Sequence, residues 1–169
     1  MPRKATSVPD VSDEPFRAAV EAAECLKWQP GLQVVSAAEG KGQVAGKDPS
    51  QLLGGAFIDE DCKAAPVGSG KHRWDYVLGY QRSDEAIAHF VEVHPAHSHG
   101  VTEVEAKLAW LRDYLEQKAQ AELNALKREY HWVASGKIDI PKHVPQYKML
   151  QTRLRKLGLN GPVKHLTLA

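Results

Sequence analysis

The sequence predicts an α/β (or α+β) fold, with a mixed sheet of four to five strands and helices packed on it. Short runs rich in aromatic and β-branched residues alternate with amphipathic segments of helical period. The strands before residue 94 form a meander, and a long helix separates them from the next strand, which predicts a mixed sheet. With 169 residues, the chain is long enough to bury a sizeable core as one domain.

The elements are predicted in order along the chain. Residues 1–12 are polar and hold two prolines, so we expect a flexible tail before a single globular domain of residues 13–169. Residues 36–55 are rich in glycine and predict a mobile loop. The remaining pattern predicts a helix over 13–28, strands starting at 56, over 73–80 and over 86–94, a helix over 102–127, a strand over 130–135, a helix over 147–157 and a strand over 163–168.

The hairpin of residues 73–94 carries the candidate chemistry. Side chains alternate along a strand, so Glu92 and His94 project from the same face. If Gln81 pairs with Ala86 across the turn, Asp75 lies opposite Glu92. Two carboxylates placed opposite each other cost stability, and a bound divalent cation would offset that cost.

This order of elements, with acids on consecutive strands, resembles the core of the PD-(D/E)XK (restriction-endonuclease-like) nuclease superfamily over residues 13–135. The motif of that superfamily is an acid on the second strand of the meander and an acid-x-Lys on the third. Asp75 matches the first acid and Glu92 the second, while His94 stands in place of the motif Lys. Some such folds move the Lys to the following helix, where Lys107 is the candidate.

The resemblance implies a metal-dependent nuclease with Asp75, Glu92, His94 and Lys107 as catalytic residues. Asp75 and Glu92 would bind Mg²⁺ or Mn²⁺, which prefer oxygen ligands. His94 or Lys107 would handle the attacking water. A further acid from the first helix would be Glu21 or Glu24. 

The same residues also allow a structural interpretation. Asp75 would pair with Arg73 or Arg82, and Glu92 would accept a hydrogen bond from His94 or Trp74. Glu103 and Lys107 have the i,i+4 spacing of an ordinary helix-supporting ion pair.

The C-terminal segment after Pro141 holds cations and no acid, which is typical of a surface that contacts phosphates. The candidate nucleic-acid-binding residues are Lys148, Arg153, Arg155 and Lys156. The alternative is a solvated helix face, because the net charge of the whole chain is only +1.

Histidines and cysteines offer a weaker metal hypothesis. His89, His94, His97 and His99 are potential zinc ligands, although His89 faces the opposite side of its strand from His94. Cys25 and Cys62 lack CxxC spacing, so we expect two thiols in a reducing compartment and not a disulfide.

These features predict a cytoplasmic protein, because no apolar run reaches membrane-spanning length and the N-terminus does not have the pattern of a signal peptide. The predicted function is a divalent-metal-dependent, nuclease-like phosphodiesterase acting on nucleic acid. The alternative is a non-catalytic protein of the same fold that binds a protein or nucleic-acid partner. A histidine-dependent metal-binding protein is the third class.

Overall fold

The computed structural model describes residues 14–31, 42–70, 72–143 and 145–169, so the tail predicted over residues 1–12 lies outside the described residues. The α-helices are α1 (Glu14–Ala22), α3 (Ile58–Cys62), α4 (Ser98–Glu116), α5 (Ala121–Ala125) and α6 (Pro145–Lys156). The 3₁₀ turns are η1 (Pro49–Gln51), η2 (Pro66–Gly68) and η3 (Lys118–Gln120). The strands are β1 (Gln29–Pro30), β2 (Val44–Gly46), β3 (Leu52–Ala56), β4 (Tyr76–Arg82), β5 (Glu85–His94), β6 (Lys127–Ala134), β7 (Leu159–Val163) and β8 (Leu166–Leu168).

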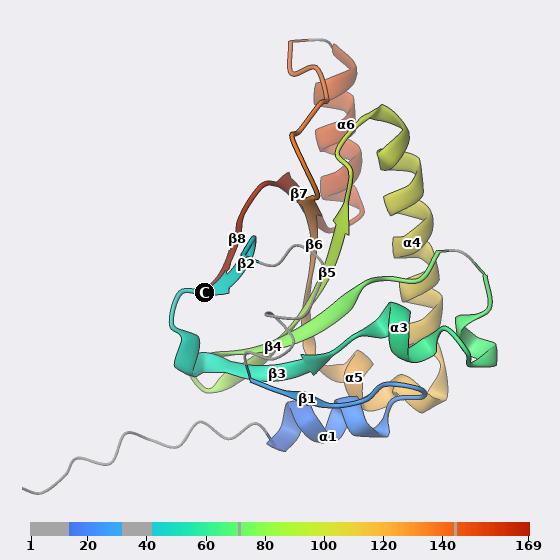
Figure 1. The fold of residues 1–169 in the computed structure, drawn as a ribbon, viewed down its shortest axis with the longest axis vertical. Coiled ribbons are helices and arrows are strands. Elements are labelled where there is room, and N and C mark those ends of the chain that lie inside the picture. Colours follow the sequence, from blue (N-terminus) through green and yellow to red (C-terminus); the bar gives the residue numbers. More distant parts are fainter. Residues whose placement is uncertain (1–13, 32–41, 71, 144) are drawn as a thin grey trace, which may run out of the picture.

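The main sheet is mixed and has six strands in the order β1-β3-β4-β5-β6-β7 (Figure 1). Strands β1, β3, β4 and β5 pair antiparallel, whereas β5, β6 and β7 pair parallel. The predicted mixed sheet with packed helices is confirmed, but the expected four to five strands are too few. The additional edge strands β1 and β7 hold Pro30 and Pro162, which weaken any strand signal in the sequence.

The main sheet is covered on both faces, which explains why β5 reads as a nearly continuous apolar run. One face packs against the helices, and its core includes Phe16, Val77, Ala88, Phe90 and Leu108. The other face packs against a two-stranded parallel ribbon of β2 and β8, and its core includes Val44, Leu78, Tyr80, Val91 and Leu168. Figure 1 shows this ribbon and α4 on opposite sides of the sheet. We call these surfaces the helix face and the ribbon face.

The β4–β5 hairpin has the predicted register. Gln81 pairs with Ala86, and the ladder continues to Tyr76 opposite Val91. The connecting turn is shorter than the predicted 81–85, because only Ser83 and Asp84 separate the strands. Ser83 adopts a left-handed conformation (φ 56°) that allows the chain to reverse in so few residues.

Part of the glycine-rich stretch that predicts a loop over 36–55, namely residues 36–41, lies outside the described residues, and its last residues form the buried strand β3 instead. In β3, a Cβ on Gly54 would lie 2.5 Å from the carbonyl oxygen of Gln29, and one on Gly55 would clash with the carbonyl oxygen of Val77. Glycine is therefore required by the close approach of the neighbouring strands, and not by a turn. The strand predicted to start at residue 56 is the helix α3, whose first turn carries three acids, a charge pattern that favours a helix N-terminus.

Helix α4 starts earlier and ends earlier than the predicted 102–127. Its N-cap is His97, whose Nδ1 accepts a hydrogen bond from the backbone N–H of Gly100, so the predicted first residue, 102, lies inside the helix. The predicted C-terminal part is divided between η3 and α5. None of the described helices combines the length and the apolar character needed to cross a membrane.

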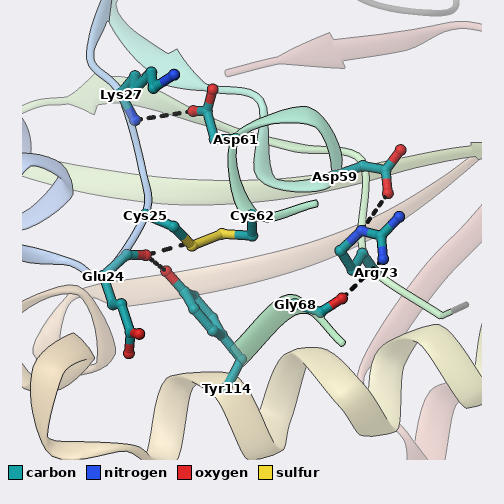
Figure 2. The surroundings of a disulfide bond; sticks show 9 residues. All are labelled: Glu24, Cys25, Lys27, Asp59, Asp61, Cys62, Gly68, Arg73 and Tyr114. Atoms are coloured by element: carbon teal, nitrogen blue, oxygen red, sulfur yellow. Dashed lines mark hydrogen bonds and ion pairs between the residues drawn. A yellow bond between two sulfur atoms is a disulfide. The ribbon is translucent and has the colours of Figure 1, made fainter. Parts of the chain in front are cut away.

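Cys25 and Cys62 form a disulfide, so the expectation of two thiols is wrong (Figure 2). Their Cα atoms lie 5.1 Å apart, which is within the range of disulfides, although the residues are 37 positions apart in the chain. The bond connects the segment after α1 to the end of α3. Beside it, the Tyr114 hydroxyl donates to the carbonyl oxygen of Glu24 at 2.7 Å, and the Lys27 N–H donates to Asp61 Oδ2 at 2.9 Å.

Candidate active site

The structure brings Asp75, Glu92 and Lys107 together on the helix face. Asp75 immediately precedes β4, Glu92 lies near the end of β5, and Lys107 projects from α4, which covers this face. The Lys107 ammonium group contacts Glu92 Oε1 and lies 3.6 Å from Asp75 Oδ1. One lysine on the crossover helix therefore bridges two acids from adjacent strands.

Backbone amides hold both carboxylates where the β4–β5 ladder ends. The N–H of Asp75 donates to Glu92 Oε2 at 3.2 Å, and the N–H of Val93 donates to Asp75 Oδ2 at 2.8 Å. Each acid thus accepts a hydrogen bond from the strand that carries the other acid. This reciprocal arrangement fixes the side chains before any ligand arrives.

The electrostatics of the three groups are unbalanced. Glu92 is fully buried, and burial followed by the nearby charge of Asp75 raises its pKa well above the ordinary value. Burial opposes the charge on Lys107, but the carboxylates of Glu92 and Asp75 outweigh burial and raise the pKa of the ammonium group. One ammonium group faces two carboxylates, so the ionised cluster has a formal charge of −1.

His94 lies next to this cluster and is bound to Glu103. The ring Nε2 of His94 is 2.6 Å from Glu103 Oε2, and its Nδ1 is 3.6 Å from Glu92 Oε1. Burial lowers the pKa of His94 in spite of the bond to Glu103. The i,i+4 pairing expected between Glu103 and Lys107 is replaced, because Glu103 binds His94 and Lys107 binds Glu92.

Glu103 is the residue of this site that the sequence prediction missed. The i,i+4 spacing in the sequence predicts that Glu103 pairs with Lys107. Its observed contact with His94 depends instead on how α4 crosses the end of β5. That crossing is a tertiary feature.

The arginines named as alternative partners of Asp75 are engaged elsewhere. Arg73 binds Asp59 at 2.8 Å, and Arg82 binds Glu129 at 3.1 Å. Trp74, the alternative donor to Glu92, keeps its ring N–H buried without a hydrogen-bond partner among the described residues.

The acids proposed from the first helix do not join the cluster. Glu21 forms an exposed ion pair with Arg17 on α1. Glu24 follows α1 and lies beside the disulfide, where Figure 2 shows its backbone carbonyl facing Tyr114.

The candidate nucleic-acid-binding residues lie on α6 and are exposed: Lys148, Arg153, Arg155 and Lys156. Arg153 binds Glu105 of α4 at 2.6 Å, so helix α6 reaches α4 through Glu105. Glu105 and Lys107 are two positions apart, or about 200° around a helix axis. Arg153 therefore meets α4 on a different side of that helix from Lys107.

The four histidines do not form one cluster. His97 is the N-cap of α4, and its ring centroid lies 6.2 Å from that of His99 on the exposed first turn. His94 belongs to the helix face, whereas His89 is buried on the ribbon face, as strand alternation predicts. The partners of His89 are His131 and Glu129, which sequence reasoning did not select.

The geometry of these clusters is the basis for any functional conclusion, because no family model matches this chain and no curated protein or solved structure matches it either.

Proposed function

We propose that this chain is a divalent-metal-dependent, nuclease-like phosphodiesterase with a restriction-endonuclease-like core. The observation that carries the proposal is the position of the Lys107 ammonium group between the carboxylates of Asp75 and Glu92. Two acids and a lysine from three separate elements meet at one point, as the resemblance implies.

The order of elements supports the same proposal. Helix α1 precedes the antiparallel meander β3–β4–β5, and α4 then crosses to the parallel strand β6. Asp75 borders the second strand of the meander, and Glu92 lies on the third. Lys107 is on the following helix, where a displaced motif Lys is expected, and His94 occupies the usual position of that Lys.

The donor set fits a hard divalent cation. Asp75 and Glu92 supply carboxylate oxygens, which are the donor atoms that hard divalent cations prefer. Asp75 and Glu92 would hold Mg²⁺ or Mn²⁺. A bound ion of this kind would polarise a phosphate oxygen and lower the pKa of a bound water.

Lys107 and His94 are suited to different roles. Because its pKa is raised, Lys107 stays protonated near neutral pH, where it holds the two carboxylates and attracts the phosphate charge. His94 is neutral at pH 7 because burial lowers its pKa. With its Nε2–H donated to Glu103, His94 presents the lone pair of Nδ1 on the side of Glu92, where it accepts the proton of the attacking water.

Nucleic acid is the proposed substrate class because of the exposed cations of α6. Lys148, Arg155 and Lys156 project into solvent and carry no acid between them on this helix. Such a surface attracts a phosphate backbone without reading its sequence.

A non-catalytic protein of the same fold is the second candidate, and the burial of Glu92 favours it. Glu92 has no exposed surface, and Lys107 and the backbone of Asp75 already satisfy its two oxygens. In that case the cluster would be a structural ion network, and α6 or another surface would bind a partner.

The test is calorimetric titration of Mg²⁺ and Mn²⁺ into wild type and Glu92→Gln, with a cleavage assay on single- and double-stranded DNA and RNA for both proteins. We expect Mn²⁺ binding and cleavage in wild type and the loss of both in Glu92→Gln. Glu85→Gln is the matched control, because Glu85 is an exposed glutamate of the same strand that pairs with Lys127. Wild type that neither binds these ions nor cleaves nucleic acid would refute the enzyme and leave the non-catalytic alternative.

A further inference from the structure

A second group of potential metal ligands lies on the ribbon face, on the other side of the sheet from the acid cluster. His89 projects from β5, and Glu129 and His131 project from the adjacent strand β6. The parallel register places His89 beside Glu129 and Val91 beside His131. Because alternate residues share a face, the three side chains converge on the same side of the sheet.

The distances between the facing atoms are those expected around a metal ion. His89 Nδ1 lies 2.9 Å from His131 Nε2 and 3.5 Å from Glu129 Oε2, and His131 Nε2 lies 3.6 Å from Glu129 Oε2. Ligands about 2.0–2.1 Å from a tetrahedral zinc ion are about 3.4 Å apart from one another. We propose that His89, Glu129 and His131 form a binding site for a divalent transition metal of the zinc class.

The protonation states of the two imidazoles allow a cation to bind between them. Burial lowers the pKa of both imidazoles to about 4, and for His89 the nearby His131 adds to this effect. Both rings are therefore neutral at pH 7. The 2.9 Å contact between the rings takes one N–H and one lone pair. A metal ion would take the lone pairs of both facing nitrogens and of Glu129 Oε2, so the ring proton between the two histidines would move to the far nitrogen of its own ring.

Neighbouring side chains orient the ligands. Arg82 binds the other oxygen of Glu129, Oε1, at 3.1 Å, which leaves Oε2 directed towards the histidines. The ring of Tyr80 lies edge-on to His89 with the centroids 6.4 Å apart. A carboxylate whose second oxygen is held in this way is typical of the supporting contacts around metal ligands.

The donor atoms and the access route decide the class of metal. Two imidazole nitrogens and one carboxylate oxygen suit zinc, cobalt or nickel, whereas Mg²⁺ prefers oxygen donors alone. His89 and His131 are buried, but the Glu129 side chain is 29% exposed, so an ion and a fourth ligand such as water would enter from its side. Three protein ligands with one open position are the pattern of catalytic zinc sites.

The test is titration of the metal-free full chain with Co²⁺, followed by the visible d–d absorption of the bound ion, and then displacement by Zn²⁺. We expect one bound Co²⁺ with the spectrum of a four-coordinate site, displaced by one equivalent of Zn²⁺. Glu129→Gln keeps the shape of the side chain but removes the charged ligand oxygen, so it should weaken binding by at least the roughly tenfold that loss of a mere supporting contact costs. His131→Gln should abolish the spectrum.

Two controls locate the ion. Glu85→Gln should leave the Co²⁺ spectrum unchanged, because Glu85 is an exposed glutamate of the same strand as His89 and pairs with Lys127. The double variant His97→Asn/His99→Asn should also leave it unchanged, since these two exposed rings form a separate histidine pair on the first turn of α4. The absence of Co²⁺ binding in wild type would overturn the proposal. Binding that survives Glu129→Gln at full strength, or that is lost with His97 and His99, would also overturn it.

Discussion

Replacing Lys107 by methionine tests the central arrangement of the candidate active site. The substitution keeps an unbranched, largely aliphatic side chain and removes the ammonium group. Asp75 and Glu92 then face each other without the cation that bridges them. The expected result is a large loss of stability at alkaline pH that becomes small in mild acid.

The structure gives the size of the effect. The side chains of Lys107, Asp75 and Glu92 are 17%, 13% and 0% exposed, so solvent screens the cluster only weakly. At an effective dielectric constant of about 20, two charges 3.6 Å apart attract by about 5 kcal/mol before the cost of burial is subtracted. Breaking such a buried pair by removing one partner costs about 3–5 kcal/mol, and we expect a loss in this range at pH 8.

The pH dependence follows from the raised pKa of Glu92. Between the ordinary pKa of glutamate and the raised value, the folded protein holds a proton that the unfolded chain has released, so Glu92 lowers stability as the pH rises. Without Lys107 this pKa rises further, so the folded variant keeps the Glu92 proton to a higher pH than wild type does. The loss caused by Lys107→Met is therefore smaller at pH 5.5 than at pH 8, and with Glu92 fully protonated it approaches about 1 kcal/mol, the value of a hydrogen bond.

The assay is urea denaturation of wild type and Lys107→Met at pH 8 and pH 5.5, followed by tryptophan fluorescence. Both proteins carry the same histidines, so the difference between them isolates the cluster. Lys127→Met removes the lysine of an exposed pair with Glu85, and it should cost less than about 1 kcal/mol at both pH values. A Lys107→Met loss no larger than that of the control, or equal at both pH values, would refute the reasoning.

Two further predictions concern the rest of the fold. The buried imidazoles of His89 and His131 take up protons only near pH 4, whereas the unfolded chain does so near pH 6.5, so each should withdraw about 3 kcal/mol of stability as the pH falls between these values. Denaturation at pH 7 and pH 5 measures how much the free energy of unfolding falls between these pH values. This decrease should be smaller for His131→Gln than for metal-free wild type, and equal decreases would contradict the burial of this ring. The disulfide closes a loop with a sequence separation of 37, so reduction should lower the free energy of unfolding by about 4 kcal/mol, measured by denaturation with and without a phosphine reductant. The double variant Cys25→Ser/Cys62→Ser should have the same free energy of unfolding as the reduced wild type, with or without the reductant. A change caused by the reductant in this variant would show that the effect does not come from the Cys25–Cys62 bond.

Local patterns were sufficient wherever neighbouring residues decide the geometry. The polar turn around Ser83 predicted the hairpin, and the pairing of Gln81 with Ala86, which the sequence allowed as a condition, places Asp75 beside Glu92. Strand parity also placed His89 away from His94. The helical period predicted over residues 102–127 placed Lys107 beside the apolar stripe that packs on the sheet. These features depend on the period of a strand or a helix, and the sequence carries that period directly.

The tertiary structure decided the features that depend on contacts between distant segments. Gly54 and Gly55 read as loop residues because the close approach of β1 and β4 that requires them is not encoded locally. Cys25 and Cys62 pair because the chain after α1 passes α3.

The two candidate sites differ in the same way. The alternation that determines which residues share a face of one strand is written in the sequence, and so Asp75, Glu92 and His94 were found. Glu103 meets His94 only through the crossing of α4 over β5, and His131 meets His89 only through the parallel register of β5 and β6. Helix crossing and parallel register are set by packing over the whole core, which no short stretch of sequence specifies.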